Sequence, residues 1–117
     1  MKFEEALHQF WNSFGVNAYD ENTVPEDAPY PRITYEVVFG NFDSDSISSV
    51  DIWDYGRFWD GVTDIKDLIM ERIGEDCGGG DIKYDGGKIT LYAEQWRRTP
   101  DDNPEIRHIT INIISNH

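Results

Sequence analysis

The residue types that most often carry catalytic or metal chemistry are few and scattered in this chain. Its three histidines, His8, His108 and His117, show no HxH or HExxH spacing, so we expect no metal-hydrolase site. Cys77 is the single cysteine and has no Cys or His neighbour, which favours a structural thiol over a nucleophile. The glycine run 78–80 lacks the Lys-Ser or Lys-Thr pair of a phosphate loop, so a turn is favoured. The sequence therefore predicts no catalytic, cofactor-binding or metal-binding residue.

One loop resembles a calcium site in part. Asn41, Asp43 and Asp45 occupy the first three ligand positions of a calcium-binding loop. Ser46 stands where that loop requires glycine, and Ile52 stands where it requires a bidentate glutamate. The match fails at both places, so only weak surface binding of a cation stays open. Carboxylate pairs elsewhere single out no general acid and base, because 23 acidic residues in 117 bring such pairs together by chance.

Negative charge is concentrated in the first two thirds of the chain. The net charge is −13, and it divides into −5 over residues 1–40, −8 over 41–81 and zero over 82–117. This sign argues against binding a nucleic-acid backbone or an anionic membrane through bulk electrostatics. A solvated acidic surface is one interpretation, and a face that repels a partner or binds cations is the other. The predicted acidic face comprises Asp43, Asp45, Asp51 and Asp54.

The densest basic spot is Trp96-Arg97-Arg98, at the start of a predicted polar loop that ends before Ile106. It lies in the electrically neutral part of the chain, so these three residues are candidates for contact with a neighbouring subunit or a partner. The alternative is a solvated surface loop. The same interpretation makes the stretch 41–81 non-adhesive.

Length and composition indicate one domain over residues 1–117. The chain is 38% hydrophobic and 14% aromatic, which argues against disorder despite the high charge. A single cysteine excludes an intramolecular disulfide and fits a reducing compartment. No apolar run approaches the roughly 18 residues of a membrane span, and the N-terminus does not resemble a secretory signal.

Two amphipathic helices are predicted. Residues 2–14 place Phe3, Leu7, Trp11 and other apolar side chains at three- and four-residue spacing, and Gly15 is the expected stop. A second apolar stripe predicts a helix over 62–73. Its candidate N-cap is Thr63, and its expected stop is Gly74.

The remaining segments alternate as strands do. Segments 33–39 and 46–55 are expected to form an antiparallel hairpin, with a bulge between Ile47 and Val50 where the alternation slips. Segments 82–84 and 88–96 flank Asp85-Gly86-Gly87, a hairpin signal, and 106–114 is the last strand. The long loop 16–31 leaves room for a short strand near 16–19. The predicted fold class is α+β, a mostly antiparallel sheet of four to five strands with two helices packed on it.

This order of elements resembles the tail-terminator, or tail-completion, proteins of long-tailed bacteriophages. The resemblance rests on the short N-terminal helix ending at Phe14, the proline-led strand Pro29-Tyr30-Pro31-Arg32-Ile33-Thr34-Tyr35, the acidic strand turn, the helix 62–73 and the last strand Ile109-Thr110-Ile111-Asn112-Ile113. It covers nearly the whole chain.

The resemblance implies a virion assembly protein without enzymatic activity. Proteins of that family close into a ring, usually a hexamer, on the last ring of the tail tube and offer a surface to the head–tail connector protein. It implies a place in the virion tail or neck, with assembly in the host cytoplasm, no membrane contact, and DNA only as passing cargo. An acidic lumen suits that passage, because it repels phosphates.

Other functions stay open from the sequence. Another phage neck or minor capsid protein has a similar composition. An acidic DNA mimic, which inhibits host DNA-binding proteins, would place carboxylates in rows on its surface. A small enzyme of undefined chemistry is a weaker interpretation.

Overall fold

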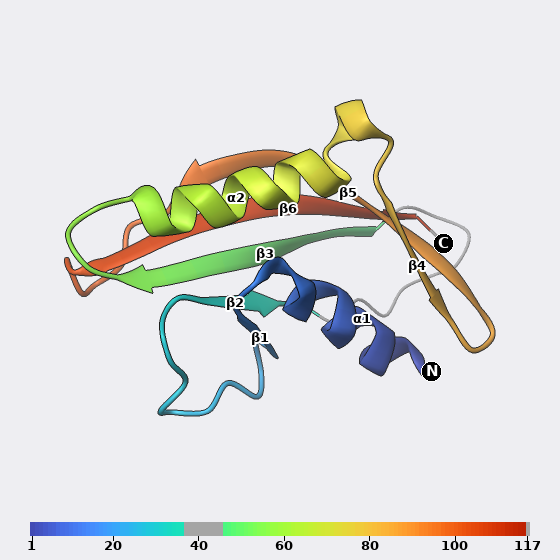
Figure 1. Cartoon of the computed structure of the whole chain (residues 1–117), viewed down its shortest axis with the longest axis horizontal. Helices are drawn as coiled ribbons and strands as arrows, with labels where there is room; N and C mark the ends of the chain where they lie inside the picture. Colours follow the sequence, from blue (N-terminus) through green and yellow to red (C-terminus); the bar gives the residue numbers. More distant parts are fainter. Residues whose placement is uncertain (37–45, 117) are drawn as a thin grey trace.

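The computed structural model describes residues 1–36 and 46–116, and these residues form one mixed, curled sheet with two helices (Figure 1). In chain order the elements are α1 (Phe3–Trp11), a 3-10 turn (Asn12–Phe14), β1 (Asn17–Asp20), β2 (Arg32–Tyr35), β3 (Ser46–Tyr55), α2 (Asp60–Ile73), a second 3-10 turn (Glu75–Cys77), β4 (Gly80–Tyr84), β5 (Gly87–Arg98) and β6 (Ile106–Asn116).

The sheet confirms the α+β class and differs from the prediction in strand number. Its order is β1-β2-β3-β6-β5-β4, which gives six strands within the described residues. All neighbours are antiparallel except β1 and β2, which run parallel, with Asn17 opposite Arg32. The additional strand is β1, at the place where the long loop left room for one. Its four residues are too few to show a clear alternation, and only Ala18 among them is buried.

Both helices pack on the same face of the sheet. Figure 1 shows α2 lying along β3, β6 and β5, while α1 contacts the two edge strands of the sheet, β1 and β4. Side chains from α1, such as Leu7 and Trp11, and from α2, such as Ile69, share one core with the inward residues of the strands. We call the opposite face of the sheet, which carries Asp51 and Thr110, the helix-distal face.

The helix boundaries follow the sequence signals except at two places. The α-helix of α1 ends at Trp11, and the last residues of the predicted helix form a 3-10 turn instead. Gly15 ends this turn with a φ of 87°, as expected of a helix stop. In α2 the helix begins at Asp60, two residues before the predicted start, so Thr63 is not the N-cap. The Thr63 N–H donates instead to the Trp59 carbonyl at 2.9 Å, within the first helical turn. Gly74 ends α2 as predicted.

The predicted pairing of β2 with β3 is confirmed, with Arg32 opposite Trp53. The predicted turn and the outer half of the first strand fall in 37–45, outside the described residues. β3 pairs with β6 in unbroken register from Ser46 to Tyr55, so the expected bulge does not appear on that side of the strand. On the other side, the residues that would lie opposite Ile47 are outside the described residues. The bulge lies in β5 between Ala93 and Trp96. It shifts the register by one residue and lets β5 continue along β6.

The Asp85-Gly86 hairpin is confirmed, with Tyr84 opposite Gly87. Gly86 has a φ of 98°, a left-handed backbone conformation that a glycine adopts without strain. The β6 prediction is also confirmed, because Ile109, Ile111 and Ile113 are buried on the helix side. No helix among the described residues is long and apolar enough to cross a membrane.

Candidate interaction surface

The link between β3 and α2 places aromatic side chains in solvent. Phe58 exposes 70% of its surface, and Tyr55, the last residue of β3, exposes 53%. The ring of Tyr30 lies 6.1 Å from that of Tyr55 and extends the aromatic area. Contiguous exposed aromatic groups mark interaction sites more often than isolated ones do. The sequence signal for this area is the pair Phe58-Trp59 directly before the helix, which sequence analysis did not single out.

Trp59 lies beside two arginines. The guanidinium of Arg98 lies 4.4 Å from the centroid of the indole ring, and that of Arg107 lies 5.5 Å from it. Arg107 is fixed by two hydrogen bonds, from Nη1 to the Pro104 carbonyl at 2.8 Å and from Nη2 to the Arg57 carbonyl at 3.2 Å. Trp59 itself is half-buried and packs against the core. The core therefore anchors the ring on which the arginines lie.

An open cleft of about 330 Å³ lies beside this stack. Its lining includes Trp59, Arg98 and Arg107 together with residues of the loop between Thr99 and Pro104. We define the arginine–aromatic end as Tyr55, Arg57, Phe58, Trp59, Arg98 and Arg107.

The arginines of this end have no acidic partner in the described part of the chain. The ion pairs found there join other residues, and no arginine nitrogen lies within 4.0 Å of a carboxylate oxygen. Two carboxylates border the end. Asp101 lines the cleft, and Glu105 accepts a hydrogen bond from the Tyr55 hydroxyl, a bond that raises the pKa of Tyr55 above its usual value. The guanidinium groups of Arg57 and Arg98 therefore remain available to an outside carboxylate.

A row of carboxylates runs along α2. Asp60, Asp64, Asp67 and Glu71 are exposed and follow each other at intervals of four, three and four residues. That spacing places them on one line of the helix, on the side away from the buried residues such as Ile69. Leu68, 47% exposed, lies next to this line. We call the four carboxylates the α2 acidic stripe.

Lys66 lies between the acidic stripe and Trp96. Its ammonium donates to Asp67 at 2.5 Å and lies 4.2 Å from the centroid of the Trp96 ring. Lys66 is 8% exposed, so its aliphatic stem is covered, while its ammonium group is paired with the Asp67 carboxylate. Trp96 is 44% exposed, and its ring lies beside the Lys66 ammonium.

The three predicted contact residues do not form one cluster. β5 extends to Arg98, so Arg97 and Arg98 belong to a strand and not to the predicted loop. The reason is that β6 supplies partners for them, with Thr110 opposite Arg97. Alternation then places Trp96 and Arg98 on the helix side, where Arg98 meets Trp59, and Arg97 on the helix-distal face. There Arg97 donates to the Asn112 side chain at 3.4 Å.

The predicted acidic residues are likewise separated. Asp43 and Asp45 lie outside the described residues. Asp51 lies on the helix-distal face, and Asp54, three positions along the same strand, lies on the helix side. The Asp54 carboxylate is so close to Gly61, in the first turn of α2, that a Cβ there would collide with it. Asp51 and Asp54 therefore do not share one face of the sheet.

Asp51 belongs to a polar network that sequence analysis missed. Its Oδ1 accepts hydrogen bonds from His108 Nε2 and from the Thr110 hydroxyl, each at 2.7 Å. The Thr99 and Thr110 hydroxyls are 2.8 Å apart. The indole N–H of Trp53 donates to the Thr34 hydroxyl at 2.9 Å. The only sequence signal for this network was in β6, where the polar residues His108 and Thr110 alternate with the isoleucines.

The network links strands rather than opening a site. His108, Thr110 and Thr34 are each buried, with at most 7% of their surface exposed, so little of the network reaches solvent. Buried polar groups need such partners, because an unpaired one costs about 1–3 kcal/mol. This arrangement fixes the register of β2, β3 and β6.

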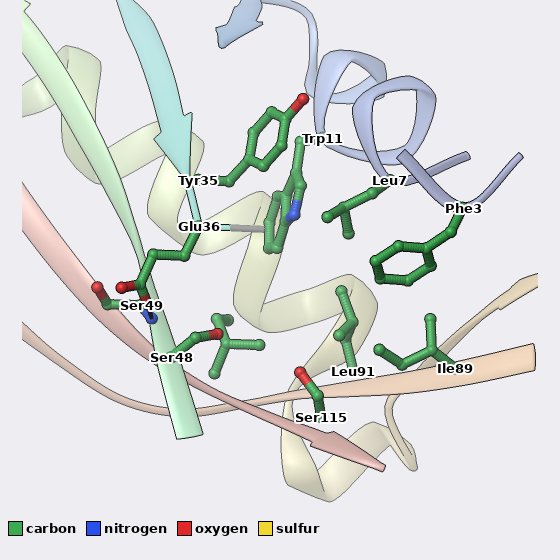
Figure 2. A pocket seen from close by; sticks show the side chains of 11 residues that line it. Phe3, Leu7, Trp11, Tyr35, Glu36, Ser48, Ser49, Ile89, Leu91 and Ser115 are labelled. Atoms are coloured by element: carbon green, nitrogen blue, oxygen red, sulfur yellow. Dashed lines mark hydrogen bonds between the residues drawn. The ribbon is translucent and has the colours of Figure 1, made fainter. Parts of the chain in front are cut away.

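A second cavity lies under α1 and holds about 10 Å³, roughly the space of one water molecule (Figure 2). The Ser115 hydroxyl oxygen is buried without a hydrogen-bond partner in the described residues. The cavity is too small for an organic ligand. Figure 2 shows its lining residues, which include Phe3, Leu7, Trp11, Ile89, Leu91 and Ser115.

Across residues 1–36 and 46–116, no group of three His, Cys, Asp or Glu side chains is placed to hold a metal ion. Cys77 is exposed and carries a free thiol. No protein-family model, curated protein or solved structure matches the chain.

Proposed function

We propose that this chain is a non-enzymatic tail terminator of a long-tailed phage, which forms a ring on the tail tube and joins it to the head. The observation that carries the proposal is the order of elements: a short helix, the proline-led segment 29–35, a second helix and an isoleucine-rich last strand. In this proposal its partners are copies of itself, the tail-tube protein and the head–tail connector protein, and DNA passes through without binding.

The surface supports the proposal in two ways. A ring needs two unlike contact areas on each copy, because neighbouring subunits meet through heterologous surfaces. The arginine–aromatic end, which directly precedes α2, and the α2 acidic stripe, which runs along the outward side of that helix, are two such areas of opposite charge. The net charge of −13 also suits a passage that repels DNA phosphates.

Electron microscopy of a lysate that lacks the gene tests this function. A bound cap removes the tube end from further growth, so we expect tails of excessive or variable length and heads without tails. Normal tails attached to full heads would exclude the terminator role. Normal tails lying free beside heads would instead indicate a head-side neck protein, and complete loss of tails would indicate an earlier assembly step.

One observation favours a second function, that of an acidic DNA mimic. The α2 acidic stripe sets four carboxylates in a row on an outward surface, as a phosphate mimic requires. A mimic acts as a competitor of DNA for a basic protein. Fluorescence competition between this chain and a labelled duplex for a basic DNA-binding protein tests it: displacement that disappears after Asp64→Asn and Glu71→Asn supports mimicry, and no displacement excludes it.

A further inference from the structure

We propose that the arginine–aromatic end of one copy binds the α2 acidic stripe of a second copy, so that copies associate head to tail. This contact rests on the self-assembly proposed above and names the two surfaces that make it. It keeps Arg98 from the sequence prediction and leaves out Trp96 and Arg97. It also corrects that prediction by placing Arg57, Phe58 and the α2 acidic stripe, all within the stretch 41–81 that was expected to be non-adhesive, in the contact.

The basic side of the contact is built to receive carboxylates. Arg57 is exposed and its guanidinium makes no hydrogen bond, ion pair or ring contact within the described chain, while Arg98 touches the Trp59 ring and leaves its nitrogens without an acceptor. A guanidinium binds a carboxylate through two parallel hydrogen bonds and lies flat on an aromatic ring at the same time. Phe58 adds the apolar area that such charged contacts need around them.

The acidic side offers matching chemistry. A helix rises about 1.5 Å per residue, so the stripe from Asp60 to Glu71 spans roughly 16 Å. Three of its four carboxylates, those of Asp60, Asp64 and Glu71, have no cation within 4.0 Å in the described part of the chain. Leu68 supplies an exposed apolar side chain beside these carboxylates. In the proposed contact it packs against Phe58 of the other copy.

One copy does not satisfy both surfaces by itself. The stripe faces outward from α2, while the arginines lie at the end of the sheet where β5 finishes and β6 begins (Figure 1). Each copy therefore carries an unused arginine–aromatic end and an unused α2 acidic stripe. When two copies bind, the stripe of one and the arginine–aromatic end of the other are still free to bind further copies. Such a contact is heterologous and extends to a closed ring or an open filament.

Complementary charge reversals test the contact. The first variant carries Arg57→Glu and Arg98→Glu and keeps an intact stripe. The second carries Asp64→Lys and Glu71→Lys and keeps an intact arginine–aromatic end. A matched control, Lys83→Glu with Lys88→Glu on the β4–β5 hairpin, changes the net charge as the first variant does but far from either surface. Circular dichroism establishes that each variant is folded, and sedimentation and native mass spectrometry measure association.

We expect each reversal variant alone to be monomeric, with self-association weakened at least tenfold relative to the control. An equimolar mixture of the two should regain association, starting from a one-to-one heterodimer, because the intact stripe of the first variant meets the intact arginines of the second, and the introduced glutamates and lysines also attract one another. Absence of that dimer overturns the contact, even if the unaltered chain assembles. The tail phenotype in the lysate is a separate readout, so loss of the contact and loss of the terminator role are distinguishable.

Discussion

His108 and Trp53 lie on the helix-distal face with their rings stacked, at a centroid distance of 3.6 Å and an angle of 14° between the planes. The two residues are direct partners across β3 and β6. The stack covers the imidazole, and Asp51 accepts a hydrogen bond from its Nε2. A carboxylate, an imidazole and an indole therefore tie two central strands together on the face opposite the helices.

Replacing Asp51 should destabilise the fold without involving any assembly surface. Asp51→Ala leaves His108 Nε2 and the Thr110 hydroxyl without their shared acceptor, and buried groups in that state cost about 1–3 kcal/mol. Urea unfolding measures the difference. Asp102→Ala, at an exposed loop position, is the matched control and should change the free energy of unfolding by less than about 0.5 kcal/mol. Equal effects of the two substitutions would refute a structural role for the network.

Tyr35 should make the fold sensitive to alkaline pH. Burial raises the pKa of its hydroxyl from 10.0 to about 12. Below pH 10 the hydroxyl is neutral in both the folded and the unfolded chain, so its full contribution to the free energy of unfolding is present. Between pH 10 and 12 the unfolded chain loses this proton first, so stability falls by up to roughly 2–3 kcal/mol. Unfolding of the Tyr35→Phe variant should lose part of this pH dependence, and an unchanged slope would contradict the assignment.

The elements that sequence predicted well are those whose signals are local. The stripe of α1, the Asp85-Gly86 turn and the isoleucines of β6 each follow from the spacing of neighbouring residues. β1 and the end of β5 are strands because they pair with segments more than ten residues away in the chain. The spacing of their own residues therefore did not define them. Arg97 and Arg98 were predicted to lie in a loop. Pairing with β6 places them in a strand instead, where their side chains lie on opposite faces of the sheet.

The candidate surface followed the same rule. Arg98 was identified from its type, but its neighbours Trp59 and Arg107 come from two other segments, and only the fold brings them together. The α2 acidic stripe was readable from the intervals of its residues. It was not singled out, because an abundance of acidic residues obscures any one row.

Divalent cations and salt should promote self-association. Each copy carries a net charge of −13, so long-range repulsion opposes the approach of two copies. At physiological salt, charges more than about 8 Å apart are largely screened, while contacts at shorter range persist. Light scattering across magnesium and sodium chloride concentrations should therefore show larger assemblies as either rises from low values. A chain that stays monomeric at high concentration in every condition would contradict ring formation.

Arg98 and Arg97, adjacent in sequence, should differ in their effect on assembly. Arg98→Glu places a negative charge beside Trp59 on the proposed contact surface, and it should weaken self-association about tenfold or more. Arg97→Glu makes the same charge change on the helix-distal face, where the side chain meets Asn112, and should leave association nearly unchanged. Replacing Asp43 and Asp45 by asparagine should also weaken it less than Arg98→Glu does. Sedimentation equilibrium of the variants under one salt condition measures the difference. If both arginine variants weaken association alike, net charge governs assembly and the strand alternation of these two side chains has no part in it.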